Sequence, residues 1–209
     1  INYHTFSNLL IYPYSYVNTE TPDSTYFRAL TAEITKDNLY SAGRDLQTVG
    51  YAVRGASDDW MYAGMSGKKI MAYTPEVGTV DDGFWPPANR IIPQCAENLS
   101  TNRMTAWSAA VNLRPVQYYV VENPQTGFTR LVVEVQNIGI QDASAPAGLT
   151  LRPLSAGITV LRSDRQIRAL RSTELVREVF DCTFDASIQN GSIIPVEILI
   201  TQENTPRRD

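Results

Sequence analysis

The chain has 209 residues, 43% of them hydrophobic and 19% charged, with a formal net charge of −4. This composition is typical of a globular protein rather than a disordered or fibrous one, and the length suits one large domain or two small ones. The acidic balance provides no basic footprint for a nucleic acid or an anionic membrane. In addition, no apolar run approaches the roughly 20 residues that span a bilayer. For these two reasons neither a nucleic acid nor a membrane is expected as a partner.

The first half of the chain alternates extended and helical patterns. The predicted elements, in order, are a strand over residues 1–13, a helix from about 23 to 38, a short helix over 57–63, a buried strand over 70–77 and a final helix over 91–111. In the first helix Phe27, Leu30 and Ile34 share one face, and Asp23 or Ser24 is expected to cap it. Strands that alternate with helices predict an α/β sheet with helices packed on it.

The composition changes after Leu113, where short runs rich in Val, Ile, Thr and aromatic residues are separated by Gly, Pro, Asn and Ser. Strands are predicted over residues 116–121, 129–135, 157–161, 179–184 and 193–200. Residues 165–178 are predicted to form a helical turn or an irregular excursion instead. We therefore expect a first domain over residues 1–112 and an all-β sandwich over residues 113–209. The stretch Asn137-Ile138-Gly139 resembles the strand end of many immunoglobulin-like accessory modules.

The two cysteines, Cys95 and Cys182, fall in different predicted domains. Neither belongs to a CxxC motif or has a nearby histidine, so the spacing predicts no metal site. A disulfide would have to join the two domains, and free thiols are therefore favoured over a bridge.

Residues 50–78 carry a phenol and a carboxylate that suit acid/base chemistry. Tyr51 lies on a glycine-flanked loop, and Glu76 follows an apolar, strand-like run. Most such residues are merely solvated or hydrogen-bonded, and that alternative stays open. His4 is the only histidine, and a lone histidine at the start of a strand is more often structural than a ligand. Trp60 and Tyr62 are expected to pack in the core.

Several motifs, in one order, resemble the zinc metallocarboxypeptidases of the A/B type. They cover residues 1–111 and comprise HTFSNLLIYPYSY from His4, the loop around Tyr51, the turn Ser57-Asp58-Asp59-Trp60, the segment Tyr73-Thr74-Pro75-Glu76 and GFWPPANRIIPQCAENL from Gly83. Two features depart from the family pattern: Pro75 stands where the animal enzymes usually carry an aromatic residue, and Ser66-Gly67-Lys68 looks like an insertion. The resemblance implies the C-terminal half of a mixed-sheet carboxypeptidase domain.

The resemblance also implies a mechanism. In the family, zinc polarises the scissile carbonyl and activates a water, and the glutamate matched by Glu76 takes the proton from that water. His4 matches the last of three zinc ligands, and Tyr51 matches a tyrosine that closes over the substrate's C-terminal carboxylate. The other two ligands belong to an upstream H-x-x-E motif, which a chain with one histidine cannot contain. Zn²⁺ is therefore expected in the complete enzyme, whereas these residues alone are expected to be inactive and to hold zinc weakly.

The same resemblance points to a pocket for the substrate's last side chain. Asp58 matches the pocket-floor position that is apolar in A-type and aspartate in B-type enzymes. Ser15 matches another B-like position, and Thr74 joins them in the implied substrate-binding set. A carboxylate on the floor predicts a preference for a C-terminal Lys or Arg, although Leu46, near the pocket wall, is bulkier than such a side chain favours. The alternative is that Asp58 faces solvent in the first turn of the short helix.

The leading hypothesis is thus an exopeptidase that releases C-terminal amino acids, here with an incomplete catalytic domain followed by the sandwich. The alternative is a non-catalytic peptide-binding or structural protein that keeps the carboxypeptidase fold. The expected partners are a peptide or protein substrate and either the missing N-terminal half or a second copy, which would cover the exposed part of the sheet. The resemblance favours a secreted or periplasmic protein.

Overall fold

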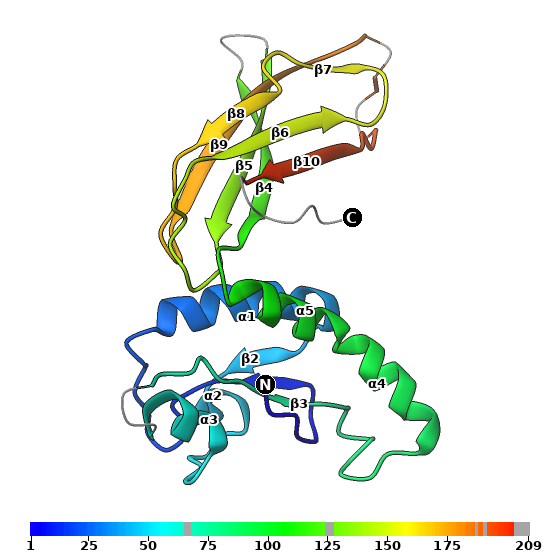
Figure 1. Cartoon of the computed structure of the whole chain (residues 1–209). Coiled ribbons are helices and arrows are strands. Elements are labelled where there is room, and N and C mark those ends of the chain that lie inside the picture. Colours follow the sequence, from blue (N-terminus) through cyan, green and yellow to red (C-terminus); the bar gives the residue numbers. More distant parts are fainter. Residues whose placement is uncertain (65–67, 124–127, 187, 190–191, 203–209) are drawn as a thin grey trace. The chain divides into compact units, whose positions relative to one another are not determined.

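The computed structural model describes residues 1–64, 68–123, 128–186, 188–189 and 192–202. It divides into two compact units, residues 1–109 and residues 110–209, which are described separately (Figure 1). Of the segment Ser66-Gly67-Lys68, the first two residues lie outside the described part of the chain.

The first unit is an α/β structure built on a small mixed sheet. Its elements are β1 (Leu9–Ile11), α1 (Ser24–Asn38), β2 (Ser41–Gly43), α2 (Asp45–Thr48), α3 (Ser57–Asp59), the π-helical turn η1 (Trp60–Gly64), β3 (Thr74–Glu76), the 3₁₀ turn η2 (Ala88–Arg90), α4 (Ile91–Glu97) and α5 (Leu99–Ser108). β1 is the central strand, parallel to β2 and antiparallel to β3. Figure 1 shows α1 and α5 side by side on one side of this sheet.

An aromatic cluster around Phe27 joins α1 to the sheet. Phe27 is fully buried, and its ring stacks on Tyr12 with a centroid separation of 5.2 Å and meets Tyr73 edge-on at 5.3 Å. Leu30 and Ile34 lie on the same buried face of the helix. The predicted helix and its apolar face are therefore confirmed, because residues spaced three and four apart share one side of a helix.

The predicted strand over residues 1–13 is mostly wrong, since only Leu9–Ile11 forms β1. Ser7 and Asn8 have positive φ angles, of 120° and 54°, which break an extended run. Their backbone N–H groups instead donate to the carbonyl of Gly78, at 2.8 and 2.9 Å. The turn that results brings the residues before it close to the end of β3.

Two other expectations for the first unit need correction. The strand predicted over residues 70–77 is limited to Thr74–Glu76. The predicted final helix is divided at Asn98 into α4 and α5. Asn98 is buried, and its side-chain amide donates to the Tyr40 hydroxyl and to the Gln94 carbonyl, both at 3.0 Å. These bonds hold Asn98 outside regular helix, because an asparagine side chain competes with the helical ladder.

The second unit consists of two antiparallel sheets. Its strands are β4 (Leu113–Asn123), β5 (Phe128–Asn137), β6 (Ala147–Pro153), β7 (Ile158–Val160), β8 (Asp164–Ile167), β9 (Leu175–Phe184) and β10 (Val196–Thr201). One sheet has the order β4-β5-β9-β7 and the other β10-β6-β8. Val133, Val135 and Phe180 of the first sheet share an apolar core with Leu149 and Leu151 of the second, so the two sheets are held together by one core.

A buried asparagine organises the end of β5. Asn137 is fully buried, and its side-chain oxygen accepts the backbone N–H groups of Asn112 and Gly139, both at 3.1 Å. Its side-chain amide donates to the carbonyls of Gln141 and Leu170, at 2.8 and 3.1 Å. A Cβ on Gly139 would lie 1.9 Å from the carbonyl of Ala110, so only glycine fits where the backbone passes this closely.

Two predictions for the second unit differ from the structure. β6 was not expected, although Ala147, Leu149 and Leu151 alternate with less buried residues as a half-buried strand requires. Residues 165–178 contain the strand β8 and the start of β9 rather than a helical turn. The loop between them is tied by the Arg168–Glu174 ion pair, at 2.7 Å.

Both cysteines are free thiols, with Cys95 exposed and Cys182 buried. None of the helices in the described ranges has the length and apolar character needed to cross a membrane.

Candidate active site

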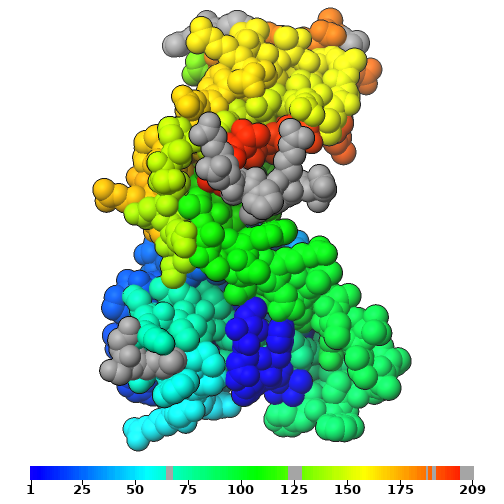
Figure 2. All heavy atoms as spheres, in the orientation of Figure 1, coloured from blue at the N-terminus to red at the C-terminus, as the bar shows by residue number. Residues whose placement is uncertain are grey.

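His4 and Glu76 meet where the N-terminal segment runs beside β3. The two residues form an isolated parallel bridge, in which the His4 N–H donates to the Pro75 carbonyl at 2.9 Å and the Val77 N–H donates to the His4 carbonyl at 3.0 Å. Figure 2 shows the N-terminal segment, in dark blue, at the surface of the first unit. The bridge therefore places a histidine from the first motif and a glutamate from the fourth side by side.

The side chains of this pair are close but differ in exposure. The Nδ1 atom of His4 lies 4.0 Å from Oε1 of Glu76, and the two side chains are 53% and 16% exposed. The side-chain amide of Asn2 lies 3.0 Å from Nε2 of His4 and donates to the Ser57 hydroxyl at 2.8 Å. Asn2 thus links the histidine to the start of α3 and restrains the orientation of the imidazole.

The carboxylate of Glu76 is poised to take up a proton. Its Oε2 atom is buried and has no hydrogen-bond partner. Burial raises the pKa of Glu76, the nearby His4 lowers it, and the negative charge of Asp45 adds to the rise. A glutamate with a raised pKa is a better proton acceptor near neutral pH, which is the property that a general base needs.

Thr74 lies in the same strand as Glu76, whereas Tyr51 lies on a separate, exposed loop. Thr74 lies two residues before Glu76 in β3, so the two side chains share one face of the strand. Tyr51 is 62% exposed, and no hydrogen bond joins it to His4 or Glu76 in the described part of the chain. Its loop is anchored by the Val53 N–H, which donates to the carbonyl of Ser15 at 3.0 Å.

Asp58 and Ser15 lie together in the interior. Asp58 is 2% exposed and Ser15 is 1% exposed, so the alternative that Asp58 faces solvent is wrong. The Ser15 hydroxyl lies 3.5 Å from Oδ1 of Asp58, which also accepts the N–H of Asp59 at 2.9 Å. Burial raises the pKa of Asp58 to about 6. Buried carboxylates whose pKa is raised this far are typical of functional sites.

Asp59 holds the segment that carries Ser15. Its two carboxylate oxygens accept the Ser15 N–H at 2.9 and 3.1 Å, and one of them accepts the Tyr16 N–H at 3.2 Å. These bonds fix the chain after β1 against α3 and so set the position of Ser15 relative to Asp58. The sequence reasoning missed this role, as it missed Asn2; the only local signal was an aspartate beside the pocket-floor position.

The aromatic residues after Asp59 behave differently from each other. Tyr62 is 4% exposed, as expected for a packing residue, and its hydroxyl donates to Asp23 at 2.6 Å. Trp60 is 58% exposed, so the expectation that it packs in the core is wrong. Asp23 occupies the N-cap position of α1, as expected, but its side chain accepts bonds from Tyr62 and Lys69 and makes no capping bond to the helix.

The donor set for zinc is incomplete within this chain. No group of three or more His, Cys, Asp or Glu side chains in the described ranges is arranged to hold a metal ion. His4, with its half-exposed imidazole beside Glu76, fits one ligand of a catalytic site. A catalytic zinc site needs three protein ligands and an open position for water. Of the three ligands, the described residues offer one, His4.

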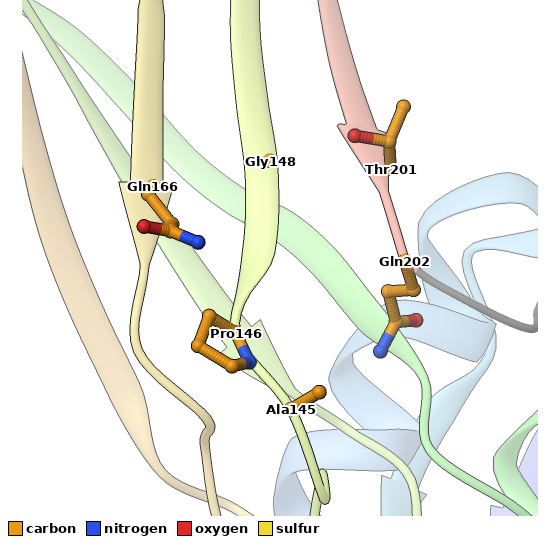
Figure 3. Close-up of a pocket in the computed structure, with 6 residues that line it drawn as sticks. All are labelled: Ala145, Pro146, Gly148, Gln166, Thr201 and Gln202. Carbon is orange, nitrogen blue, oxygen red and sulfur yellow. The ribbon is translucent and has the colours of Figure 1, made fainter.

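The second unit has a pocket of its own, of about 360 Å³. It is lined by Ala145, Pro146, Gly148, Gln166, Thr201 and Gln202, drawn in Figure 3. Its polar groups are amides and a hydroxyl, with no carboxylate, imidazole or thiol among the lining residues. This pocket therefore offers no acid/base or metal chemistry.

Comparisons with known proteins give relatives for the first unit. Residues 1–101 match the family model described as zinc carboxypeptidase. Carboxypeptidase B2 of Rattus norvegicus is 31% identical over 120 residues, which are 54% of this chain and 28% of the relative. Carboxypeptidase B2 of Homo sapiens is 27% identical over the same shares.

A solved structure of bovine thrombin-activatable fibrinolysis inhibitor in complex with tick carboxypeptidase inhibitor is also similar, with 24% identity and a TM-score of 0.42. That match covers 50% of this chain and 36% of the other chain. The chain therefore spans well under half the length of the relatives it matches. The family match and the ordered motifs agree, and they identify the first unit as a metallocarboxypeptidase-like domain of the A/B type.

Proposed function

We propose that this chain is part of a zinc-dependent exopeptidase that releases C-terminal amino acids, preferably basic ones, from peptides. The pairing of His4 with Glu76 is the observation that supports the proposal most strongly, since it joins a ligand-type side chain to a carboxylate whose Oε2 atom has no hydrogen-bond partner. The zinc carboxypeptidase family match over the same residues supports the same chemistry.

In this proposal Glu76 moves the protons. Zinc, when bound, supplies a Lewis acid that polarises the scissile carbonyl and makes water a stronger nucleophile. Glu76 accepts a proton from the attacking water and then donates it to the leaving amine. Burial is the main cause of the raised pKa of Glu76. This raised pKa keeps the free-energy difference between the ionised and the protonated carboxyl group small. Asn2 holds the imidazole of His4 in place, and Tyr51, on its exposed loop, is free to approach a bound substrate.

The proposal places two zinc ligands outside these residues, in the rest of the catalytic domain or in a partner that completes it. We therefore expect the 209-residue chain alone to show no zinc site tighter than about micromolar, or about 8 kcal/mol, in calorimetric titration. His4→Ala should weaken this binding further, because it removes the one proposed ligand that the chain supplies. A single tight site in the chain alone would mean that the ligands come from these residues after all.

The preference for basic residues rests on Asp58. In the complete enzyme, kcat/KM for a peptide ending in Arg should exceed that for the same peptide ending in Phe by about tenfold or more, since a charge-assisted contact is stronger than a neutral one. Asp58→Asn should remove this preference, because it replaces the carboxylate with a neutral group of the same shape. Faster cleavage after Phe than after Arg in the unaltered protein would contradict the proposal.

A non-catalytic peptide-binding protein that keeps the fold is the second candidate. It is favoured by the incomplete donor set of the described residues, and activity assays of the complete protein separate it from the first.

We also propose that the second unit is an immunoglobulin-like accessory sandwich without chemistry of its own. Its two antiparallel sheets with one core and its chemically inert pocket support that role.

A further inference from the structure

The carboxyl ends of β1 and β2 lie at one edge of the sheet, because these two strands pair in parallel from Leu9–Ile11 to Ser41–Gly43. Ser15 follows β1 after a short turn, and Asp45 follows β2 after one residue. Asp59 binds the backbone of Ser15 and so brings Asp58 to the same edge. Polar groups at the carboxyl ends of parallel strands commonly form ligand sites.

Asp45, like Asp58, is a buried aspartate with one side-chain oxygen that lacks a hydrogen-bond partner. Asp45 is 5% exposed and Asp58 is 2% exposed, and the Oδ2 atom of each is buried with no hydrogen-bond partner. Buried polar atoms normally have partners, so these two oxygens are available to the donors of a bound ligand. The negative charge of Asp45 contributes to the raised pKa of Asp58, Asp59 and Glu76, after burial in each case, which agrees with the placement of Asp45 at this edge of the sheet.

No cation of the described chain neutralises this group. Lys and Arg side chains within the described ranges make no ion pair with Asp45, Asp58 or Asp59. The buried side chain of Arg44, next in sequence to Asp45, pairs instead with Glu20 at 3.3 Å and donates to Asn18 at 3.2 Å. A cationic ligand would supply the positive charge that these aspartate side chains lack.

We propose that Asp45 is a specificity-determining residue that acts with Asp58 to bind the cationic end of the substrate's last side chain. The inference rests on the proposed function, and it adds a second carboxylate to a pocket that the motifs assign to Asp58 and Ser15. A guanidinium carries five N–H donors in a planar fork, and an ammonium carries three. Each of these groups therefore has enough donors for the buried Oδ2 atoms of both aspartates.

Activity of the complete protein on two matched peptides gives the first test. One peptide ends in arginine and the other in citrulline, which has nearly the same shape and no charge. Asp45→Asn should lower kcat/KM for the arginine peptide by about 30-fold or more and leave the citrulline peptide almost unchanged. The matched control is Asp81→Asn, since Asp81 is exposed and lies outside the site. Equal losses on both peptides would show a structural role and overturn the inference.

Thermal unfolding of the same complete protein gives a test that does not depend on turnover. Asp45→Asn should raise Tm by about 2–4 °C, because it removes a buried charge without a partner. Arginine should raise the Tm of the unaltered protein more than that of Asp45→Asn, whereas citrulline should raise neither. These results without hydrolysis would refute the proposed exopeptidase but keep the cation site. A fall in Tm on Asp45→Asn, or equal effects of arginine on both proteins, would refute the cation site even in an active enzyme.

Discussion

Replacing Glu76 with glutamine in the complete enzyme is expected to lower kcat by about 10²–10⁴-fold or more. Glutamine keeps the shape of the side chain but cannot accept the proton of the attacking water. Oε2 of Glu76 has no hydrogen-bond partner, so the substitution breaks no bond at that atom and the fold should persist. Peptide hydrolysis under saturating substrate measures the loss.

Zinc content decides how that loss is interpreted. Glu76 is not one of the proposed ligands, so Glu76→Gln should retain the zinc of the unaltered enzyme, whereas His4→Ala should lose most of it. Asp81→Asn again serves as the surface control and should behave as the unaltered enzyme does. Near-normal turnover by Glu76→Gln would contradict the assignment of the base, and a loss of zinc from the same variant would mean that Glu76 supports the metal site instead.

Replacing Asn137 with alanine should destabilise the second unit by about 3–5 kcal/mol. Four backbone groups would lose the side chain that they bond, and each buried group left unpaired costs about 1–3 kcal/mol. Partial relaxation and water entry keep the total below the sum. Denaturant unfolding of the protein measures the change as a shift in midpoint.

Gln136→Ala is the matched control for this prediction. Gln136 precedes Asn137 in β5 and makes one side-chain bond, to the Thr173 carbonyl at 2.8 Å, so its loss should cost about 1 kcal/mol. If the second unit carries no chemistry, Asn137→Ala should also leave kcat/KM of the complete enzyme unchanged at temperatures where the unit stays folded. Equal costs for the two variants would contradict the central role of Asn137.

The long helix of the first unit was predictable from its periodicity, whereas the bounds of that unit's short strands were not. α1 has fifteen residues and a clear apolar face, so its pattern repeats several times. β1, β2 and β3 have three residues each, which is too short for alternation to appear. Their existence depends on pairing with distant strands, and local preference does not encode that pairing.

The residues of the candidate site were also predictable only in part. His4, Glu76 and Asp58 were identifiable because motifs in a fixed order marked their positions, while a histidine or carboxylate alone has no specific meaning. Asp45 carried no such mark. Its proposed role depends on its burial and on its place directly after β2, which lies beside β1 only in the folded sheet.

The pairing of β1 also bears on how the first unit folds. β1 receives one partner from beyond α1 and the other from beyond the Tyr51 loop, so both contacts close long stretches of chain. Such contacts lose loop entropy before they contribute stability, and they form slowly. The bonds that join His4 to Pro75 and Val77 also join distant parts of the chain, so we expect them to form late in folding. Hydrogen exchange at the amides of His4 and Val77 would report cooperative opening of the whole unit rather than local fraying.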